Sequence, residues 1–343
     1  MFSHSGYSCS MYKITQDGKT IVGNNEDWIN GNSEIWFVPA KDNKYGVMNI
    51  GFDNGFAQGA VNEAGLMFDG FAMSYLEVKN TKGKIKVSMT ELIAPIMHKY
   101  SNVIEVKEHL SKIDLSILDK SMLVFVDKSG KYLIVEGDEL ILGNNAEQSF
   151  SNFYPSETSN PEMVNIDFYQ KGLKQIRETE AKATLDYCSS IMNNFQQNLT
   201  QYTTIYDLKD GIIRLYHHQN FDNFIELDLA EELSKGEHKL SIPELFPKNT
   251  KGYKYYEIYN NADSVVSYYE SVWEKMSKQV PPESIKMLEA TISQYLTLTA
   301  DEWVKTNKDK NGAIKMYKLI IKLFPENKEA KKSAKKKIKQ TKR

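Results

Sequence analysis

Cys9 opens a strand-like segment, Cys-Ser-Met-Tyr-Lys-Ile, that turns at Asp17-Gly18 and returns into Gly-Asn-Asn-Glu-Asp-Trp at residues 23–28. If the residues before Cys9 were removed, this one residue would carry both a thiol and a free α-amine. Reference pKa values of about 8.5 for a thiol and about 8 for an α-amine allow the amine to act as the base that activates the sulfur. The hairpin also brings the carboxylate of Asp27 close enough to orient that amine. The pattern therefore predicts a cysteine nucleophile and its base within one short hairpin.

The segments that must position this hairpin alternate between strand and helix patterns. Turn residues such as Asp, Asn and Gly separate short apolar or alternating runs, which are typical of strands. The expected order is strands up to about residue 72, helices over 90–112, a hairpin over 121–135, an irregular loop over 143–165, helical periodicity over 168–191 and a second hairpin over 203–217. This order predicts an α+β fold in which two antiparallel sheets pack together with helices outside.

A domain boundary is expected near residue 250. We divide the chain into a short lead at 1–8, a first domain at 9–250 and a helical region at 251–343, which starts with a tyrosine-rich linker over 251–259. Residues 312–327 resemble the second helix of a tetratricopeptide repeat and the turn after it. One repeat cannot bury its own apolar face, so this region is expected to pack on the first domain or on a partner, such as a second copy of the chain.

Composition excludes several classes of protein. The 343 residues carry a net charge of −2, which gives no general attraction to nucleic acid, and the lysine-rich last twenty residues are expected to form the solvated face of a terminal helix. Two cysteines are too few for a disulfide framework or a clustered metal site, so we expect no metal and no organic cofactor. No apolar run is long enough to span a membrane, and residues 1–8 show no signal peptide. The expected location is cytoplasmic, or periplasmic or secreted if an N-terminal signal has been trimmed.

Several motifs occur together in the order seen in one known group of enzymes. The chain resembles the cysteine N-terminal-nucleophile (Ntn) hydrolases of the choloylglycine hydrolase and penicillin V acylase group, and most closely the acyl-coenzyme A:isopenicillin-N acyltransferase-like branch. The resemblance covers about residues 9–247 and is carried by Cys9, Gly23 and Asn25, the 18-residue step to Asp27, the Asn62-Glu-Ala-Gly-Leu66 turn, Asn152 and the hairpin from Tyr206 to Tyr216. It implies an αββα four-layer sandwich.

The resemblance also implies roles for individual residues. The precursor is expected to cut itself between Ser8 and Cys9, after which Cys9 is nucleophile and base, Asp27 holds the α-amine and Asn152 stabilises the oxyanion. One branch of the group has arginine where this chain has Asn24, so Asn24 and Asn25 are candidate substrate contacts.

Two further features depart from that branch. The oxyanion asparagine after the Asn62 turn falls near Ala72, where a backbone N–H is the expected substitute. Arg177 or Arg214 is the candidate for a displaced guanidinium, and Arg177 is the one we include among the substrate contacts.

The function predicted from these residues is hydrolysis of a linear, non-peptide amide through a thioacyl-enzyme, with a small N-acyl amide as the substrate. Two alternatives stay open at this point. The same thioacyl intermediate suits acyl transfer to an amine, and a relative with this fold that has lost catalysis would use its cleft or its helices for binding. A lone cysteine in a strand is otherwise most often a small buried apolar residue.

Overall fold

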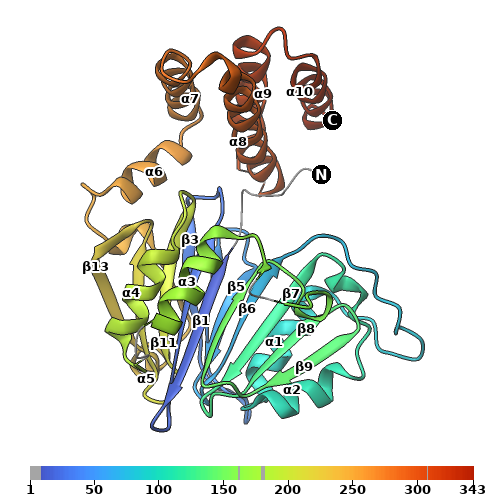
Figure 1. Ribbon diagram of the computed structural model, residues 1–343, viewed down its shortest axis with the longest axis vertical. Coiled ribbons are helices and arrows are strands. Elements are labelled where there is room, and N and C mark those ends of the chain that lie inside the picture. Colours follow the sequence, from blue (N-terminus) through green and yellow to red (C-terminus); the bar gives the residue numbers. More distant parts are fainter. Residues whose placement is uncertain (1–8, 161–162, 179–181, 307) are drawn as a thin grey trace. The chain divides into compact units, whose positions relative to one another are not determined.

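Figure 1 shows the computed structural model of the chain, which describes residues 9–160, 163–178, 182–306 and 308–343. The chain divides into two compact units. The first unit runs to Trp28 and continues over Ser33–Pro247, and the second comprises Ile29–Asn32 and Lys248–Arg343. The short segment Ile29–Asn32 therefore belongs with the C-terminal helices, although it directly follows the predicted active-site hairpin.

Two antiparallel sheets form the first unit. The six-stranded sheet has the order β10 (Glu147–Ser151), β1 (Ser10–Gln16), β2 (Lys19–Asp27), β11 (Thr200–Asp207), β12 (Ile212–His217) and β13 (Asn220–Asp228). The eight-stranded sheet has the order β14 (His238–Ser241), β3 (Ser33–Val38), β4 (Val47–Phe52), β5 (Ala57–Asn62), β6 (Leu66–Ala72), β7 (Ser121–Asp127), β8 (Tyr132–Glu136) and β9 (Glu139–Gly143).

Helices cover the outer face of each sheet. On the six-stranded sheet, α4 (Leu185–Phe195) packs against β1, β2 and β11, and α3 (Asp167–Glu178) packs against α4 and β10. On the eight-stranded sheet, α1 (Met89–Lys99) packs against β5, and α2 (Val103–Leu110) packs against β7 and β8. A further short helix, α5 (Leu229–Ser234), contacts β3, β4 and β13. The order helix, sheet, sheet, helix confirms the predicted αββα sandwich.

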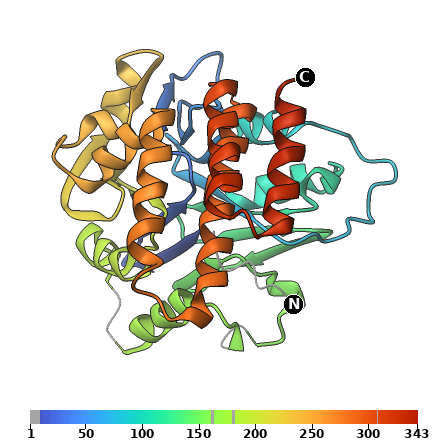
Figure 2. The ribbon, with the colours of Figure 1, turned by 90° about the horizontal axis from the view of Figure 1, so that it is seen from above.

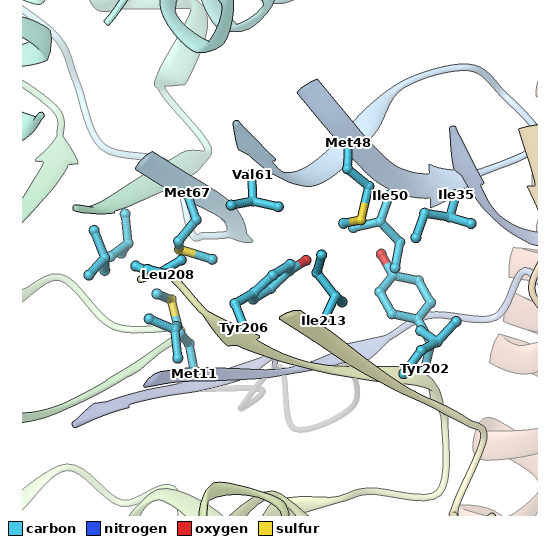
Figure 3. Packing of buried hydrophobic residues seen from close by; sticks show 14 of the residues in the cluster. Met11, Ile35, Met48, Ile50, Val61, Met67, Tyr202, Tyr206, Leu208 and Ile213 are labelled. Atoms are coloured by element: carbon cyan, nitrogen blue, oxygen red, sulfur yellow. The ribbon is translucent and has the colours of Figure 1, made fainter. Parts of the chain in front are cut away.

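Strand alternation decides which side chains point between the sheets. In β1 and β2, Met11 and Val22 belong to the apolar core between the two sheets, whereas Tyr12 and Ile21 belong to the core beneath α4. Successive residues of a strand point to opposite faces, so residues of the same parity share a face. Figure 3 shows Met11 in this inner layer together with Tyr202 and Tyr206, whose hydroxyl oxygens point toward the opposite sheet.

The predicted loop over 143–165 is wrong in one part, because β10 lies within it and pairs with β1. This strand places Phe150 in the core, but its other residues are Glu, Gln and Ser, which do not produce an alternating apolar pattern. The continuous helical periodicity expected over 168–191 is likewise divided between α3 and α4.

Helices make up most of the second unit: α6 (Lys251–Tyr259), α7 (Ala262–Met276), α8 (Ile285–Lys305), α9 (Lys310–Leu323) and α10 (Lys328–Thr341). In Figure 2 the last helices are orange to red, and α9 packs against α7, α8 and α10. Trp303 and Tyr317 lie in the buried core of this unit, and the Tyr317 hydroxyl donates to Asp301. The prediction that the tyrosine-rich segment 251–259 is a linker is wrong, because this segment forms α6.

Candidate active site

Cys9 lies at the end of the sandwich, directly before β1, and faces the core between the sheets. Its side chain is buried, with 7% of the residue's surface exposed. Burial and the nearby carboxyls of Glu26 and Asp27 raise the pKa of the Cys9 thiol well above its usual range, while a hydrogen bond from the Asp27 backbone N–H lowers it. The thiol of the uncleaved chain is therefore protonated near neutral pH, and a nearby base must remove its proton before the sulfur can attack.

Glu26 is the carboxyl on the same face as this thiol, and the sequence analysis missed it. The pairing of Ser10 with Asn25 in the β1–β2 hairpin sets Glu26 across from Cys9. The Glu26 carboxyl forms hydrogen bonds with the Cys9 thiol and the Asn24 side chain. Burial, together with repulsion from Asp27, raises the pKa of Glu26 to about 8. A carboxyl with a pKa in this range can take up and return a proton under physiological conditions.

Asp27 ends β2 and directs its carboxylate away from the inner face. The Thr200 hydroxyl and the Gln197 amide both donate hydrogen bonds to the Asp27 carboxylate. Burial raises the pKa of Asp27 to about 7, against the opposing effect of these two hydrogen bonds. Through its backbone N–H, Asp27 still contacts the Cys9 sulfur, so the structure brings the two predicted residues together.

Asn152 follows β10, one residue beyond the pair formed by Ser10 and Ser151. The Ser151 hydroxyl donates to the Cys9 carbonyl, and the Asn152 amide donates to the Ala72 carbonyl at 2.6 Å. Ala72 ends β6 in the opposite sheet, so the bond between Asn152 and Ala72 links the two sheets beside Cys9. Three predicted site residues, namely Cys9, Asn152 and Ala72, thus lie at one end of the sandwich.

The other predicted contacts separate into two groups. Asn24 shares the inner face with Glu26 and lies beside it. Asn25 faces α4 instead, where its amide donates to the Met192 carbonyl at 3.0 Å and accepts from the Thr203 hydroxyl at 2.6 Å. Asn25 therefore fastens β2 to the helical layer and is turned away from the Cys9 thiol.

Neither arginine is shown to supply a guanidinium to the site. Arg214 in β12 forms ion pairs with Asp186 at 2.6 Å and with Glu226 at 2.8 Å. Its neighbours Ile213 and Leu215 belong to the core between the sheets, so Arg214 points to the opposite face, and the guanidinium expected from it is absent from the Cys9 site. Arg177 falls in α3, but its side chain lies outside the part of the chain that the structure describes.

Three more polar residues face the inner layer near Glu26, and none was predicted. Asp69 in β6 is 1% exposed, and its carboxyl oxygens form no hydrogen bond beyond a contact with the backbone N–H of the adjacent Gly70. The hydroxyls of Tyr202 and Tyr206 in β11 are also buried without a partner. Burial and the charge of Glu26 raise the pKa of Asp69 well above its usual range, which shows that the two carboxyls are close enough to interact.

A cavity of about 140 Å³ opens at the far end of the sandwich from Cys9, between the β5–β6 turn and the β11–β12 turn. At this end Asn62 donates to the carbonyls of Met97 and Tyr100, both at 2.8 Å, and accepts from two backbone N–H groups of its own turn. The Asn62 motif therefore fastens the turn to the end of α1 and takes no part in the Cys9 site.

The described residues contain no cluster of three or more His, Cys, Asp or Glu side chains arranged to hold a metal ion. Within the same residues, no helix has the length and apolarity needed to cross a membrane.

Two packed antiparallel sheets, covered by helices and holding a cysteine at the start of an inner strand, define the architecture of an Ntn hydrolase. Residues 10–151 match the family model described as linear amide C-N hydrolases, choloylglycine hydrolase family. The match begins one residue after Cys9 and ends one residue before Asn152. The match agrees with the predicted resemblance to the choloylglycine hydrolase group over these residues, and with the predicted enzyme class of linear amide C–N hydrolases.

Solved structures share the fold. Penicillin V acylase from Agrobacterium tumefaciens superimposes with a TM-score of 0.52 at 17% identity, covering 68% of this chain and 91% of that one. An arginine-to-leucine variant of conjugated bile acid hydrolase from Clostridium perfringens gives a TM-score of 0.51 at 18% identity, covering 68% and 96%. At such identities the likeness shows the fold alone. No curated protein matches the sequence.

Proposed function

We propose that the chain cleaves itself between Ser8 and Cys9, and that mature Cys9 then hydrolyses a linear, non-peptide amide through a thioacyl-enzyme. The observation that carries this proposal is the surroundings of the Cys9 sulfur. The thiol contacts the Glu26 carboxyl and the Asp27 backbone N–H, and the Asn152 amide lies at the same end of the sandwich. These are the groups that a thiol nucleophile needs for deprotonation and for stabilising developing charge.

Self-cleavage requires a base other than an α-amine, because Cys9 of the precursor is held in a peptide bond. Glu26 fills this role, since its carboxyl is hydrogen-bonded to the thiol. In the proposed step Glu26 takes the thiol proton, and the sulfur attacks the Ser8 carbonyl carbon. The bond from that carbon to the Cys9 nitrogen breaks, and the nitrogen gains a proton. Water then hydrolyses the thioester, which releases the leading segment as a carboxylic acid and leaves Cys9 with a free thiol and a free α-amine.

Turnover repeats this chemistry on an external amide. The α-amine takes the thiol proton, the sulfur attacks the amide carbonyl, and the Asn152 amide donates a hydrogen bond to the resulting oxyanion. When the carbon–nitrogen bond breaks, the α-ammonium protonates the departing amine. Hydrolysis of the thioester by water then returns free Cys9 and releases the acid. In this scheme Asp27, held by Thr200 and Gln197, positions the α-amine.

Intact mass of the purified protein tests the first half of this proposal. We expect the wild-type chain to lose residues 1–8, the Cys9→Ala chain to keep them, and Glu26→Gln to slow their loss. Glu302→Gln is the matched control, because Glu302 is also a buried carboxyl with an unpartnered oxygen but belongs to the helical unit. A wild-type chain that retains residues 1–8 under all conditions overturns self-cleavage and favours a binding protein.

Release of acid from a panel of N-acyl amides tests the second half. The expected result is hydrolysis by the mature wild-type protein and none by Cys9→Ala. Adding a primary amine discriminates between the two fates of the thioacyl-enzyme. An acyl group that goes to the added amine in preference to water would replace hydrolysis with acyl transfer.

A further inference from the structure

The inner face beside Cys9 gathers polar groups that the proposed reaction does not use. Asp69, Tyr202 and Tyr206 all point into the space between the sheets, from β6 on one side and β11 on the other. Tyr202 lies across from Glu26 in the pairing of β11 with β2, so the inner groups form one continuous cluster next to the thiol. We refer to Glu26, Asp69 and Tyr202 as the inner acidic cluster.

The members of this cluster are close together yet have few hydrogen-bond partners. Repulsion from Glu26 acts on Asp69, and the charges of both carboxyls act on Tyr202, which places all three in one neighbourhood. Nevertheless one oxygen of Glu26 and the Tyr202 hydroxyl make no hydrogen bond, and the Asp69 carboxyl has only the contact with the Gly70 backbone N–H. Figure 3 shows the Tyr202 hydroxyl aimed across the inner layer toward the opposite sheet.

Buried polar groups of native proteins almost always have partners, because leaving such a group unpaired destabilises the fold. Gly59, the cross-strand neighbour of Asp69, leaves room for the Asp69 carboxylate because it has no side chain. A Cβ atom at Gly59 would lie 2.8 Å from that carboxylate. No lysine or arginine among the described residues forms an ion pair with Glu26 or Asp69. The cluster is thus rich in acceptors and has no lysine or arginine partner among those residues.

The chemistry of these acceptors selects the class of ligand. Two carboxyls and a hydroxyl in one neighbourhood match the donors of an ammonium group, which has positive charge and three N–H bonds. Cys9 is the cross-strand neighbour of Glu26, and such neighbours have Cβ atoms about 5 Å apart. A cation held by the cluster would therefore lie only a few bonds from a carbonyl under attack by the sulfur.

We propose that the inner acidic cluster is a substrate subsite for a positively charged nitrogen, so that the preferred amide carries an ammonium group a short spacer away from the scissile carbonyl. This inference rests on the proposed function, since it places the subsite beside Cys9 as the nucleophile. It assigns Asp69 and Tyr202 to substrate specificity and leaves the cleavage chemistry to Cys9, Glu26 and Asn152.

Protonation gives the subsite a second property. The titratable groups that face it are Glu26, Asp69, Cys9, Tyr202 and Tyr206, and the carboxyl of Asp27 acts on Glu26 from the opposite face of β2. Burial and mutual repulsion raise the pKa of both inner carboxyls, that of Glu26 to about 8, so protonation of the carboxyls competes with binding of a cation. A bound ammonium group favours their charged forms, so its binding releases protons and strengthens as the pH rises toward the pKa of Glu26.

A matched pair of substrates tests the subsite. β-Alanyl 4-nitroanilide and butyryl 4-nitroanilide have the same leaving group and nearly the same shape, but only the first has an ammonium group. We expect kcat/KM to favour the β-alanyl compound by on the order of 100-fold, the effect of a buried charge pair of about 3 kcal/mol. A second pair, N-butyryl ethylenediamine and N-butyryl propylamine, tests a cation in the leaving amine. Equal rates within both pairs would overturn the proposal.

Variants show whether the cluster causes the preference. Asp69→Asn and Tyr202→Phe are each expected to reduce the preference at least tenfold while the neutral substrate is still cleaved, and Glu302→Gln is expected to leave it unchanged. Circular dichroism establishes that each variant is folded, and Tyr202→Phe decides the question if Asp69→Asn does not fold. A preference that survives both substitutions would refute the assignment.

Calorimetry separates this inference from the proposed function, because it does not require turnover. Titration of the purified protein with β-alaninamide is expected to give saturable binding with proton release, measured in two buffers of different ionisation enthalpy, whereas butyramide is expected to give none. If residues 1–8 are retained and no anilide is cleaved, the proposed function fails while the titration still reports on the subsite. Equal responses to the two amides would reject the subsite even in an active enzyme.

Discussion

Replacing Asp27 by asparagine tests the electrostatics of the site through folding stability. Burial raises the pKa of Asp27 to about 7, against about 3.9 for an unfolded aspartate. Between these pH values the folded chain holds a proton that the unfolded chain has lost. Stability therefore falls as pH rises through this window, and the loss is complete above about pH 7.

The size of this effect follows from the difference of about three pKa units. At about 1.4 kcal/mol per unit, ionised Asp27 costs the folded state on the order of 4 kcal/mol above pH 7, of which about 3 kcal/mol develops between pH 5 and pH 8. For a unit of roughly 200 residues, 1 kcal/mol corresponds to about 2–4 °C in Tm. The Asp27→Asn variant is thus expected to gain roughly 6–12 °C relative to its parent as the pH rises from 5 to 8. Any loss of the hydrogen bonds from Thr200 and Gln197 adds an offset that is nearly independent of pH.

Differential scanning calorimetry at several pH values measures this gain. The parent should carry Cys9→Ala, so that no α-ammonium forms beside Asp27 and the chain stays uncleaved. Asp222→Asn provides the control, because Asp222 is exposed and the same chemical change there should leave the pH dependence intact. In the mature wild-type protein, a nearby α-ammonium should lower the pKa of Asp27 and flatten the response. Equal pH slopes for Asp27→Asn and its parent would refute the reasoning.

Two further substitutions separate catalysis from architecture. Asn152→Ala should lower kcat by about 10²–10³-fold, which is the usual effect of losing one oxyanion donor. A steady-state assay measures this loss. A loss of less than about threefold would show that Asn152 takes no part in the mechanism. Asn62→Ala removes the bonds to Met97 and Tyr100, so it should destabilise the fold by about 3 kcal/mol, seen as a lower Tm, with kcat unchanged. A large kcat effect at Asn62 would contradict its placement at the far end of the sandwich.

Much of this site follows from the hairpin that contains Cys9. A two-residue turn at Asp17-Gly18 pairs Gln16 with Lys19, and counting outward from that pair places Cys9 opposite Glu26. The sequence thus contained the signal for Glu26, which shares a face with Cys9 by the two-residue period of a strand. Asp27 was instead predicted as the carboxylate beside Cys9, from the hairpin and from the family motif, without this count.

Neither the role of Asp69 nor the strand β10 could be predicted by counting residues from a turn, and the physical reasons differ. Asp69 reaches Glu26 only because two separate sheets pack face to face, and the register between sheets is set by packing rather than by any local pattern. In β10, Phe150 is the one large apolar residue, so the strand forms because β1 offers an edge to pair with. Tertiary pairing outweighs local preference at this edge.

A contrast between two buried residues of the inner layer, one from each sheet, argues that the inner carboxyls are functional rather than tolerated. Lys13 of β1 is also fully buried, yet its ammonium group donates to the carbonyls of Gly130 and Asn145. The fold therefore supplies partners where a buried charge serves structure. Asp69 lies in the same inner layer, at the end where Cys9 lies, and its carboxylate oxygens have only the contact with the Gly70 backbone N–H. Replacing Asp69 by an apolar residue of similar size would be expected to stabilise the fold, so retention of the carboxyl beside the nucleophile is best explained by a ligand that supplies the missing donors.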